Sequence, residues 1–217
     1  MKKCIILANG EPPKKSIINF LDSKGYSTLI CADGGSNSAL KYDLIPDVII
    51  GDLDSILPET YDYYFDKCKI IKMRSQDDTD VEKCVKYAIK QKFNEAILIG
   101  ATGDRLDHSF GNLAIVLKFF NKIKIRIIHQ KSILEAATGK VKLQTYTGEI
   151  ISIYGFDDKT KIKSSGLKYP LKNISLPFGK RESTSNVALG KTVELEIKNG
   201  KIFIIRDFEM MRKYGLF

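Results

Sequence analysis

Over the first 131 residues, short apolar runs alternate with amphipathic stretches. The runs are rich in Ile, Val and Leu, and we predict that they form buried strands at Lys3–Ala8, Thr28–Cys31, Val48–Ile50, Lys69–Met73, Ala96–Ile99 and Lys124–Ile128. Between them, apolar residues spaced three and four apart are typical of helices packed on a core. The clearest faces are Val81, Cys84, Val85 and Ala88, and then Leu113, Val116, Leu117 and Phe120. This alternation predicts an α/β fold, a Rossmann-like and mainly parallel sheet with helices on both faces.

After about residue 131 the period changes to two, and no long helix is expected there. Val193–Ile197 and Ile202–Ile205 flank Asn199-Gly200, a pair typical of the tight turn of a β-hairpin. We therefore predict two domains, an α/β domain at residues 1–131 and a small all-β sandwich or barrel at residues 132–217.

Composition places the chain among globular proteins. With 217 residues, of which 43% are hydrophobic and 28% charged, it can build a sizeable core. No apolar run approaches the roughly 18 residues that span a bilayer, so we expect no membrane association. The four cysteines are far apart in the sequence and form no metal-binding spacing, which predicts reduced thiols in a cytoplasmic protein.

The charged residues are distributed unevenly. Lys and Arg number 35 against 26 Asp and Glu, a net charge of +9, but the lysines are dispersed and we expect no nucleic-acid partner. Eight aspartates, in contrast, lie in four short segments that follow predicted strands directly or within a few residues: Asp33, Asp52, Asp54, Asp77, Asp78, Asp80, Asp104 and Asp107. Because ligands bind beyond the carboxyl ends of the strands of such a sheet, we expect these segments to share one ligand-binding edge.

Carboxylates crowded at one edge repel one another, and a divalent cation would reverse that repulsion. Oxygen ligands without His or Cys suit Mg²⁺, which leaves coordination positions for substrate phosphates. The pattern therefore indicates nucleotide chemistry. Neither G-x-x-x-x-G-K-[ST] nor two glycines at the G-x-G spacing occurs, which argues against a P-loop kinase and a simple dinucleotide dehydrogenase.

Some of these residues also have structural interpretations. Thr79 and Glu82 fit a helix capping box, and Asp104 or Asp107 could cap a helix that begins near Ser109. Capping accounts for only one acidic residue per helix. It does not explain two pairs, Asp52 with Asp54 and Asp77 with Asp80, and for these we favour metal or phosphate binding. Arg105 is either a surface ion-pair partner or a bidentate phosphate donor. We do not expect His108 or His129 to bind a metal.

Four segments in this order resemble motifs of the thiamine pyrophosphokinase family: Ala32-Asp33-Gly34-Gly35, Gly51-Asp52-Leu53-Asp54-Ser55, Gln76-Asp77-Asp78-Thr79-Asp80 and Gly103-Asp104-Arg105-Leu106-Asp107-His108. The later segments Gly166–Leu171 and Ser183–Asn186 are also similar to the family. The resemblance implies an ATP:thiamine diphosphotransferase that needs Mg²⁺ and forms thiamine diphosphate and AMP. It also implies a homodimer whose active site lies between the α/β domain of one subunit, which binds ATP and Mg²⁺, and the thiamine-binding β domain of the other.

The resemblance assigns roles to particular residues. It implies Asp52, Asp54 and Asp80 as catalytic metal ligands, Asp107 and Arg105 as further catalytic groups, and substrate contacts at Asp33, Gly34, Gln76, Asp77 and Thr79. In the β domain it implies that Ser185 and Asn186 contact the pyrimidine of thiamine. The sequence departs from the family pattern in two ways: Val187 follows where bacterial members often have Glu, and the chain contains no Trp. Stacking on the ligand would then fall to Tyr169, Phe178 or another aromatic residue.

Three alternatives stay open at this point. Asp52-Leu53-Asp54 after an apolar run is also the pattern of a phosphatase with an aspartyl nucleophile. A pterin-type alcohol could replace thiamine as the acceptor. A non-enzymatic RNA- or nucleotide-binding module would use the net positive charge, and its affinity would fall steeply as salt rises. Either Asp52→Asn or Asp54→Asn should abolish turnover and leave the fold intact if the metal assignment is right.

Overall fold

The computed structural model describes residues 1–75, 77–103 and 105–217. The chain divides into two compact units, Met1–Gln130 and Lys131–Phe217. None of the described helices combines the length and apolar character needed to cross a membrane.

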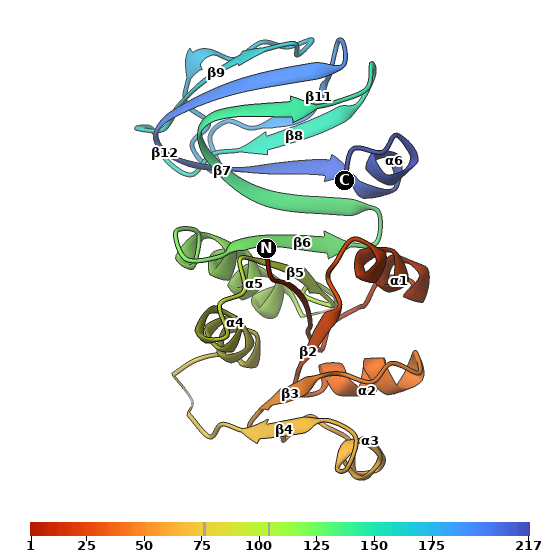
Figure 1. The fold of residues 1–217 in the computed structure, drawn as a ribbon. Coiled ribbons are helices and arrows are strands. Elements are labelled where there is room, and N and C mark those ends of the chain that lie inside the picture. The colour runs from red at the N-terminus through yellow and green to blue at the C-terminus, as the bar shows by residue number, and fades with distance from the viewer. Residues whose placement is uncertain (76, 104) are drawn as a thin grey trace. The chain divides into compact units, whose positions relative to one another are not determined.

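The first unit is built on a parallel sheet of six strands in the order β6-β5-β1-β2-β3-β4 (Figure 1). The strands are β1 Lys3–Leu7, β2 Thr28–Ala32, β3 Val48–Gly51, β4 Lys69–Lys72, β5 Glu95–Ile99 and β6 Lys124–His129. Each lies within a residue of its predicted bounds. The prediction that all six are buried is wrong for β4, which pairs only with β3 among the described residues and leaves Lys69 and Lys72 exposed.

Five helices connect these strands: α1 Lys15–Ser23, α2 Gly35–Lys41, α3 Pro58–Tyr64, α4 Asp80–Lys90 and α5 Leu106–Lys118. In Figure 1, α1, α2 and α3 lie on one face of the sheet and α4 and α5 on the other. This arrangement follows from right-handed crossovers, because the chain moves outward from β1 to β4 and then returns to β5. The predicted Rossmann-like fold class is confirmed.

Of the two predicted helix faces, the structure confirms the one on α4 and displaces the one on α5. On α4 the predicted apolar face is buried. On α5 the buried side chains are instead Asn112, Ile115 and Val116, followed by Phe119, so the predicted face is displaced by one residue. The prediction that this helix begins near Ser109 is also wrong, because it begins at Leu106 and Asp107 lies inside its first turn.

The second unit is β-rich, as predicted. It contains β7 Ser132–Gln144, β8 Ile150–Tyr154, β9 Lys161–Ser165, β10 Lys172–Ile174, β11 Ser183–Val187, β12 Thr192–Asp207 and the short helix α6 Phe208–Lys213. Strand β12 is antiparallel to β7 along most of its length, to β9 through its first half and to β8 through its second half. The unit is therefore a sandwich in which β7 and β12 contribute to both layers. Its core includes Ile151, Ile153, Val193 and Leu195.

The predicted hairpin at Asn199-Gly200 is wrong. Both flanking segments belong to β12 and pair with β7, with a register shift between Ile197 and Ile202. Asn199 does adopt the left-handed conformation that the turn signal requires, with φ of 62°. Here the left-handed residue forms a β-bulge, and the strand continues in the same direction instead of reversing.

A buried ion pair ties the second unit together. Glu149 is fully buried, and its Oε1 accepts a hydrogen bond of 2.6 Å from Nε of Arg206 on β12. The same guanidinium donates to the carbonyl oxygen of Gln144 at the end of β7. This pair joins β12 to the loop between β7 and β8.

Candidate active site at the carboxyl edge of the parallel sheet

The first unit has a cavity of about 600 Å³ at the carboxyl ends of its strands. Strands β1 and β5 are neighbours, but the helices that follow them lie on opposite faces, which makes this the topological switch point where such sheets bind ligands. The cavity is lined by the loops after β1, β2, β3 and β5 and by the segment that leads into α4.

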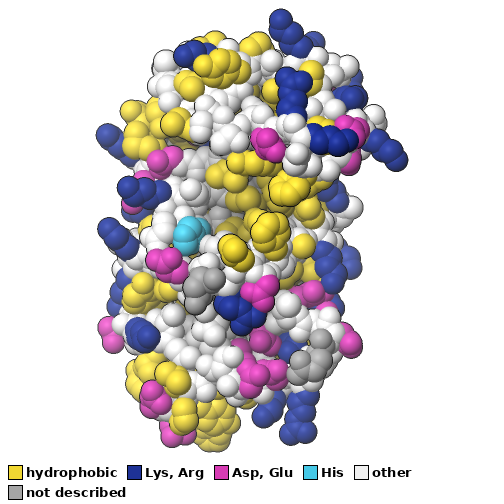
Figure 2. Space-filling model, turned by 180° about the vertical axis from the view of Figure 1, so that it is seen from behind, with side chains coloured by type: hydrophobic (Ala, Val, Ile, Leu, Met, Phe, Trp, Pro, Cys, Tyr) yellow, Lys and Arg dark blue, Asp and Glu magenta, His cyan; other side chains and the backbone are white. Residues whose placement is uncertain are grey.

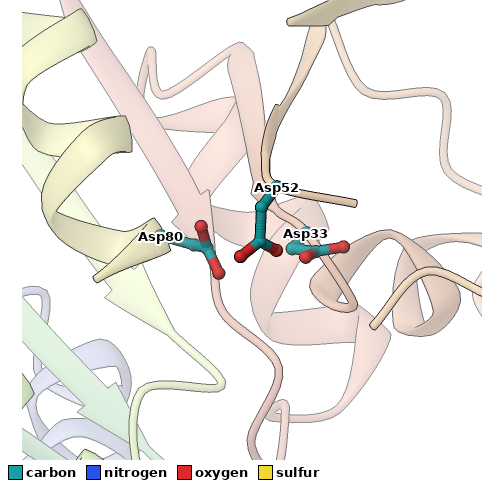
Figure 3. Close-up of side chains that lie close together, drawn as sticks. All are labelled: Asp33, Asp52 and Asp80. Atoms are coloured by element: carbon teal, nitrogen blue, oxygen red, sulfur yellow. The ribbon is translucent and has the colours of Figure 1, made fainter. Parts of the chain in front are cut away.

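Three carboxylates from separate segments meet in this cavity (Figure 3). Asp33 follows β2, Asp52 follows β3, and Asp80 is the first residue of α4. One carboxylate oxygen of each lies within 4.8 Å of the others. Because all three donors are oxygens and no sulfur or imidazole takes part, the cluster has the chemistry of a site for a hard divalent cation.

Asp33 is the most buried of the three, with 2% of its surface exposed. Burial, the hydrogen bond with Asp52 and the charges of Asp80 and Asp54 raise the pKa of Asp33 to about 6. Its Oδ1 is buried and has no hydrogen-bond partner among the described residues. This atom is therefore a ligand position that the protein itself leaves unused.

Close backbone packing holds Asp33 in place. Its φ is 42°, a left-handed conformation that Asp tolerates better than most residues. Gly51 lies beneath it, and a Cβ added at that position would come within 2.6 Å of Cβ of Asp33. Gly34, which precedes α2, is likewise packed against the side chain of Asn9. Small residues therefore let the loops after β1, β2 and β3 approach closely enough to bring the carboxylates together.

Lys83 adds a positive charge to the cluster. Its Nζ donates a hydrogen bond of 2.8 Å to Oδ1 of Asp80, one helical turn earlier on α4, and the residue is only 5% exposed. Burial lowers the pKa of Lys83, but the hydrogen bond and the charges of Asp80, Asp52 and Asp33 outweigh it and leave the pKa raised. The ammonium is therefore a permanent cation in the wall of the cavity.

The remaining predicted residues of the first unit lie around this cluster. Asp54 is exposed, accepts a hydrogen bond from Oγ of Ser55, and is not a member of the group formed by Asp33, Asp52 and Asp80. Asp77 and Thr79 line the cavity, and Thr79 Oγ1 caps α4 by accepting from the backbone N–H of Glu82. The assignment of Gln76, and the alternative cap at Asp104, lie outside the described residues.

Arg105 and Asp107 form an exposed pair at the rim of the cavity. Nε and Nη2 of Arg105 donate to the two oxygens of Asp107 at 2.9 and 2.5 Å. The guanidinium holds the pKa of Asp107 well below its usual range, so this carboxylate is a weak proton acceptor. Both side chains are about two-thirds exposed, and the guanidinium can exchange this carboxylate for a phosphate oxygen.

Of the two predicted residues of the second unit, Asn186 lies at a smaller pocket of about 220 Å³, whereas Ser185 is not among the residues that line it. Asn186 lines this pocket but is buried: its amide donates to the carbonyl oxygen of Tyr169 and accepts from the N–H groups of Tyr169 and Val187. Ser185 is exposed in a left-handed bulge of β11, with φ of 54°. Tyr169 is exposed and borders the pocket, which places an aromatic residue beside Asn186, one of the two predicted pyrimidine contacts.

Sequence reasoning missed two features of the carboxylate cluster. It assigned Asp33 to substrate binding and did not expect it to complete the cluster with Asp52 and Asp80. It also overlooked Lys83, although a lysine three residues after Asp80 on a predicted helix must lie on the same side of that helix. Helical spacing was therefore the available signal.

Comparisons with known proteins agree across the chain. A family profile described as "Thiamin pyrophosphokinase, catalytic domain" matches residues 23–129, and one described as "Thiamin pyrophosphokinase, vitamin B1 binding domain" matches residues 138–202. The chain is 30% identical to thiamin pyrophosphokinase 1 of Caenorhabditis elegans, over 93% of this chain and 88% of the relative. It is 26% identical to thiamine pyrophosphokinase of Bacillus subtilis, over 95% of this chain and 99% of the relative.

Solved structures share the fold. The Bacillus subtilis thiamine pyrophosphokinase superposes with a TM-score of 0.81 at 24% identity, covering 95% of this chain and 99% of the other. The Candida albicans enzyme gives a TM-score of 0.81 at 21% identity, covering 95% and 89%. The similarity therefore extends through both units.

Proposed function

The chain belongs to the thiamine pyrophosphokinase family, and on that premise we propose that the cluster of Asp33, Asp52 and Asp80 is where its reaction takes place. The reaction transfers the pyrophosphoryl group of ATP to the hydroxyl of thiamine and forms thiamine diphosphate and AMP. One observation carries the proposal: aspartates from three separate segments converge within 4.8 Å in the cavity at the switch point of the sheet.

The proposed metal is Mg²⁺, and the side chains fit it. The donors are carboxylate oxygens, and Oδ1 of Asp33 is a buried oxygen without a partner among the described residues. Asp52 and Asp80, together with Asp33, would hold the ion, and Asp54 remains in the proposal as a neighbouring carboxylate. When bound, the ion supplies positive charge that neutralises the triphosphate and the departing AMP.

Other residues bind and orient the two substrates in this proposal. Arg105 donates to phosphate oxygens after releasing Asp107, and Gly34, Asp77 and Thr79 contact ATP from the cavity wall. Gln76 keeps its proposed substrate contact on the basis of the resemblance alone. These contacts would hold the thiamine hydroxyl in line with the β-phosphorus, which is the main requirement of phosphoryl transfer.

In the second unit, Ser185 and Asn186 are proposed to recognise the pyrimidine of thiamine. The side chain of Asn186 would position Tyr169, because it forms hydrogen bonds with both the backbone N–H and the carbonyl oxygen of Tyr169. Tyr169 would then stack on the ring in place of the Trp that the sequence lacks.

We further propose a cytoplasmic homodimer whose active site joins the two kinds of unit from different subunits. Four unpaired cysteines support a reducing compartment. Leu106 and Phe110, one turn apart on α5, are 72% and 62% exposed beside the cavity, which supports a protein partner at that surface. Lysines and arginines are spread over the face seen in Figure 2 and form no single basic patch there, so that face does not favour nucleic acid.

The experiment titrates thiamine with Mg-ATP and measures AMP and thiamine diphosphate by chromatography. Asp52→Asn and Asp80→Asn should abolish both products while the circular dichroism spectrum is unchanged, and Asp43→Asn, at an exposed position, serves as the control. Mixing Asp52→Asn with Ser185→Ala subunits should restore part of the activity if the site is shared between subunits. Release of inorganic phosphate from simple monoesters, without AMP, would instead favour the aspartyl phosphatase.

A further inference from the structure

Lys83 is a buried cation that the metal and substrate assignments leave without a role. Its Nζ lies 2.8 Å from Oδ1 of Asp80, the residue is 5% exposed, and it lines the same cavity as Asp33 and Asp52. Ordinary surface lysines keep the ammonium in water, whereas this one directs it toward three carboxylates. Its position therefore needs an explanation in terms of the charge of the cluster.

The ammonium has two opposite effects on that cluster. Without a metal, it offsets part of the repulsion among Asp33, Asp52 and Asp80, so the carboxylates can stay together in the free protein. The same positive charge repels a divalent cation that approaches the same oxygens, and it occupies Oδ1 of Asp80. Lys83 therefore stabilises the site without metal and weakens its hold on a bare metal ion.

We propose that Lys83 is a built-in counter-ion that keeps the free site weak for divalent cations, so that the cation is held firmly only when it arrives with a triphosphate. This inference rests on the proposed function of the cluster. A triphosphate brings its own oxygen ligands and negative charge, which compensate the ammonium. Among the described residues, Asp80 is the acceptor found for Nζ, so two N–H bonds remain to donate to a phosphate oxygen.

The test measures Mn²⁺ binding to the nucleotide-free protein by electron paramagnetic resonance of the free ion, with Mn²⁺ standing in for Mg²⁺ at oxygen ligands. Lys83→Met removes the charge and keeps a chain of similar length, and we expect at least tenfold tighter Mn²⁺ binding. Lys83→Arg keeps the charge and should bind Mn²⁺ within twofold of the wild-type protein. Lys86→Met is the matched control, because Lys86 lies on the same helix and pairs with Asp78 at 2.6 Å but does not line the cavity.

The outcomes separate this role from a structural one. If Lys83 only packs and positions Asp80, Lys83→Met binds Mn²⁺ equally or more weakly, and the proposal is overturned. If the variant is unfolded without metal, recovery of the fold on adding Mn²⁺ supports the proposal, and failure to recover contradicts it. Because neither ATP nor thiamine is present, this result is independent of turnover, whereas activity that survives Asp52→Asn and Asp80→Asn would overturn the proposed function itself.

Discussion

Replacing Asp33 with Asn should stabilise the metal-free protein while it abolishes activity. The pKa of Asp33 stands at about 6 instead of 3.8, so ionising this side chain in the folded state costs about 3 kcal/mol relative to the unfolded chain. Asparagine removes the charge, keeps the shape and tolerates the left-handed φ of 42° equally well. At pH 8 we therefore expect a gain of about 3 kcal/mol, or roughly 6–12 °C in Tm.

The pH dependence identifies the cause of this gain. Below about pH 3 Asp33 is protonated in both the folded and the unfolded wild-type protein, so the variant gains nothing there. As pH rises from about 4 to about 6, the unfolded chain ionises first and the wild-type protein loses stability, while Asp33→Asn does not. The difference should grow over this range and then stay constant.

The assay is thermal unfolding followed by circular dichroism between pH 4 and pH 8 in the presence of a chelator. Asp43→Asn is the control, because Asp43 also has a left-handed φ, of 51°, but its side chain is 92% exposed. A variant of Asp33 that is less stable at pH 8, or a gain of equal size at pH 4 and pH 8, would refute the reasoning. When saturating Mg-ATP replaces the chelator, the order of stability should reverse, because only the wild-type cluster offers all three carboxylates to the cation that arrives with the triphosphate.

Other side chains give separate outcomes. Glu149→Gln leaves the buried guanidinium of Arg206 without its carboxylate and should lower the free energy of unfolding of the second unit by about 3 kcal/mol in urea denaturation; a loss under about 1 kcal/mol contradicts this. Thr79→Ala removes the cap of α4 and should cost about 1 kcal/mol, which Thr79→Ser restores. Arg105→Lys should leave the free energy of unfolding unchanged but raise KM for ATP in steady-state assays, because an ammonium cannot donate two parallel hydrogen bonds to a phosphate as a guanidinium does. An unchanged KM excludes the phosphate contact.

The strands of the first unit and the buried face of α4 were predictable because they depend on local periodicity. Apolar runs gave the strands to within a residue, and the spacing around Val85 gave the buried face of α4. The hairpin prediction at Asn199-Gly200 was wrong because a left-handed residue indicates a local bend but does not determine the direction of the chain after it. Pairing with β7 over both halves of β12 determined that direction, and such distant pairing leaves no local trace in the sequence.

The sequence predicted at which edge of the sheet the site lies, but it did not predict which aspartates form the cluster. Strand order brings the acidic segments to one end of the sheet, as expected from the βαβ pattern. Which aspartates meet depends on individual backbone angles: Leu53 has φ of 66°, and the chain turns there between Asp52, which joins the cluster, and Asp54, which does not. A single sequence does not reveal that Leu53 is left-handed, because leucine rarely adopts this conformation.

Strand β12 has a consequence for the order in which the protein is made. Both layers of the second unit depend on it, since it pairs with β7, β8 and β9, and it is the last strand of that unit to leave the ribosome. The parallel sheet of the first unit has all its strands once residue 129 has emerged, so it can form while synthesis continues. The second unit must wait, and until Thr192–Asp207 is available its earlier strands present unpaired edges that make the nascent chain prone to aggregation and a substrate for chaperones.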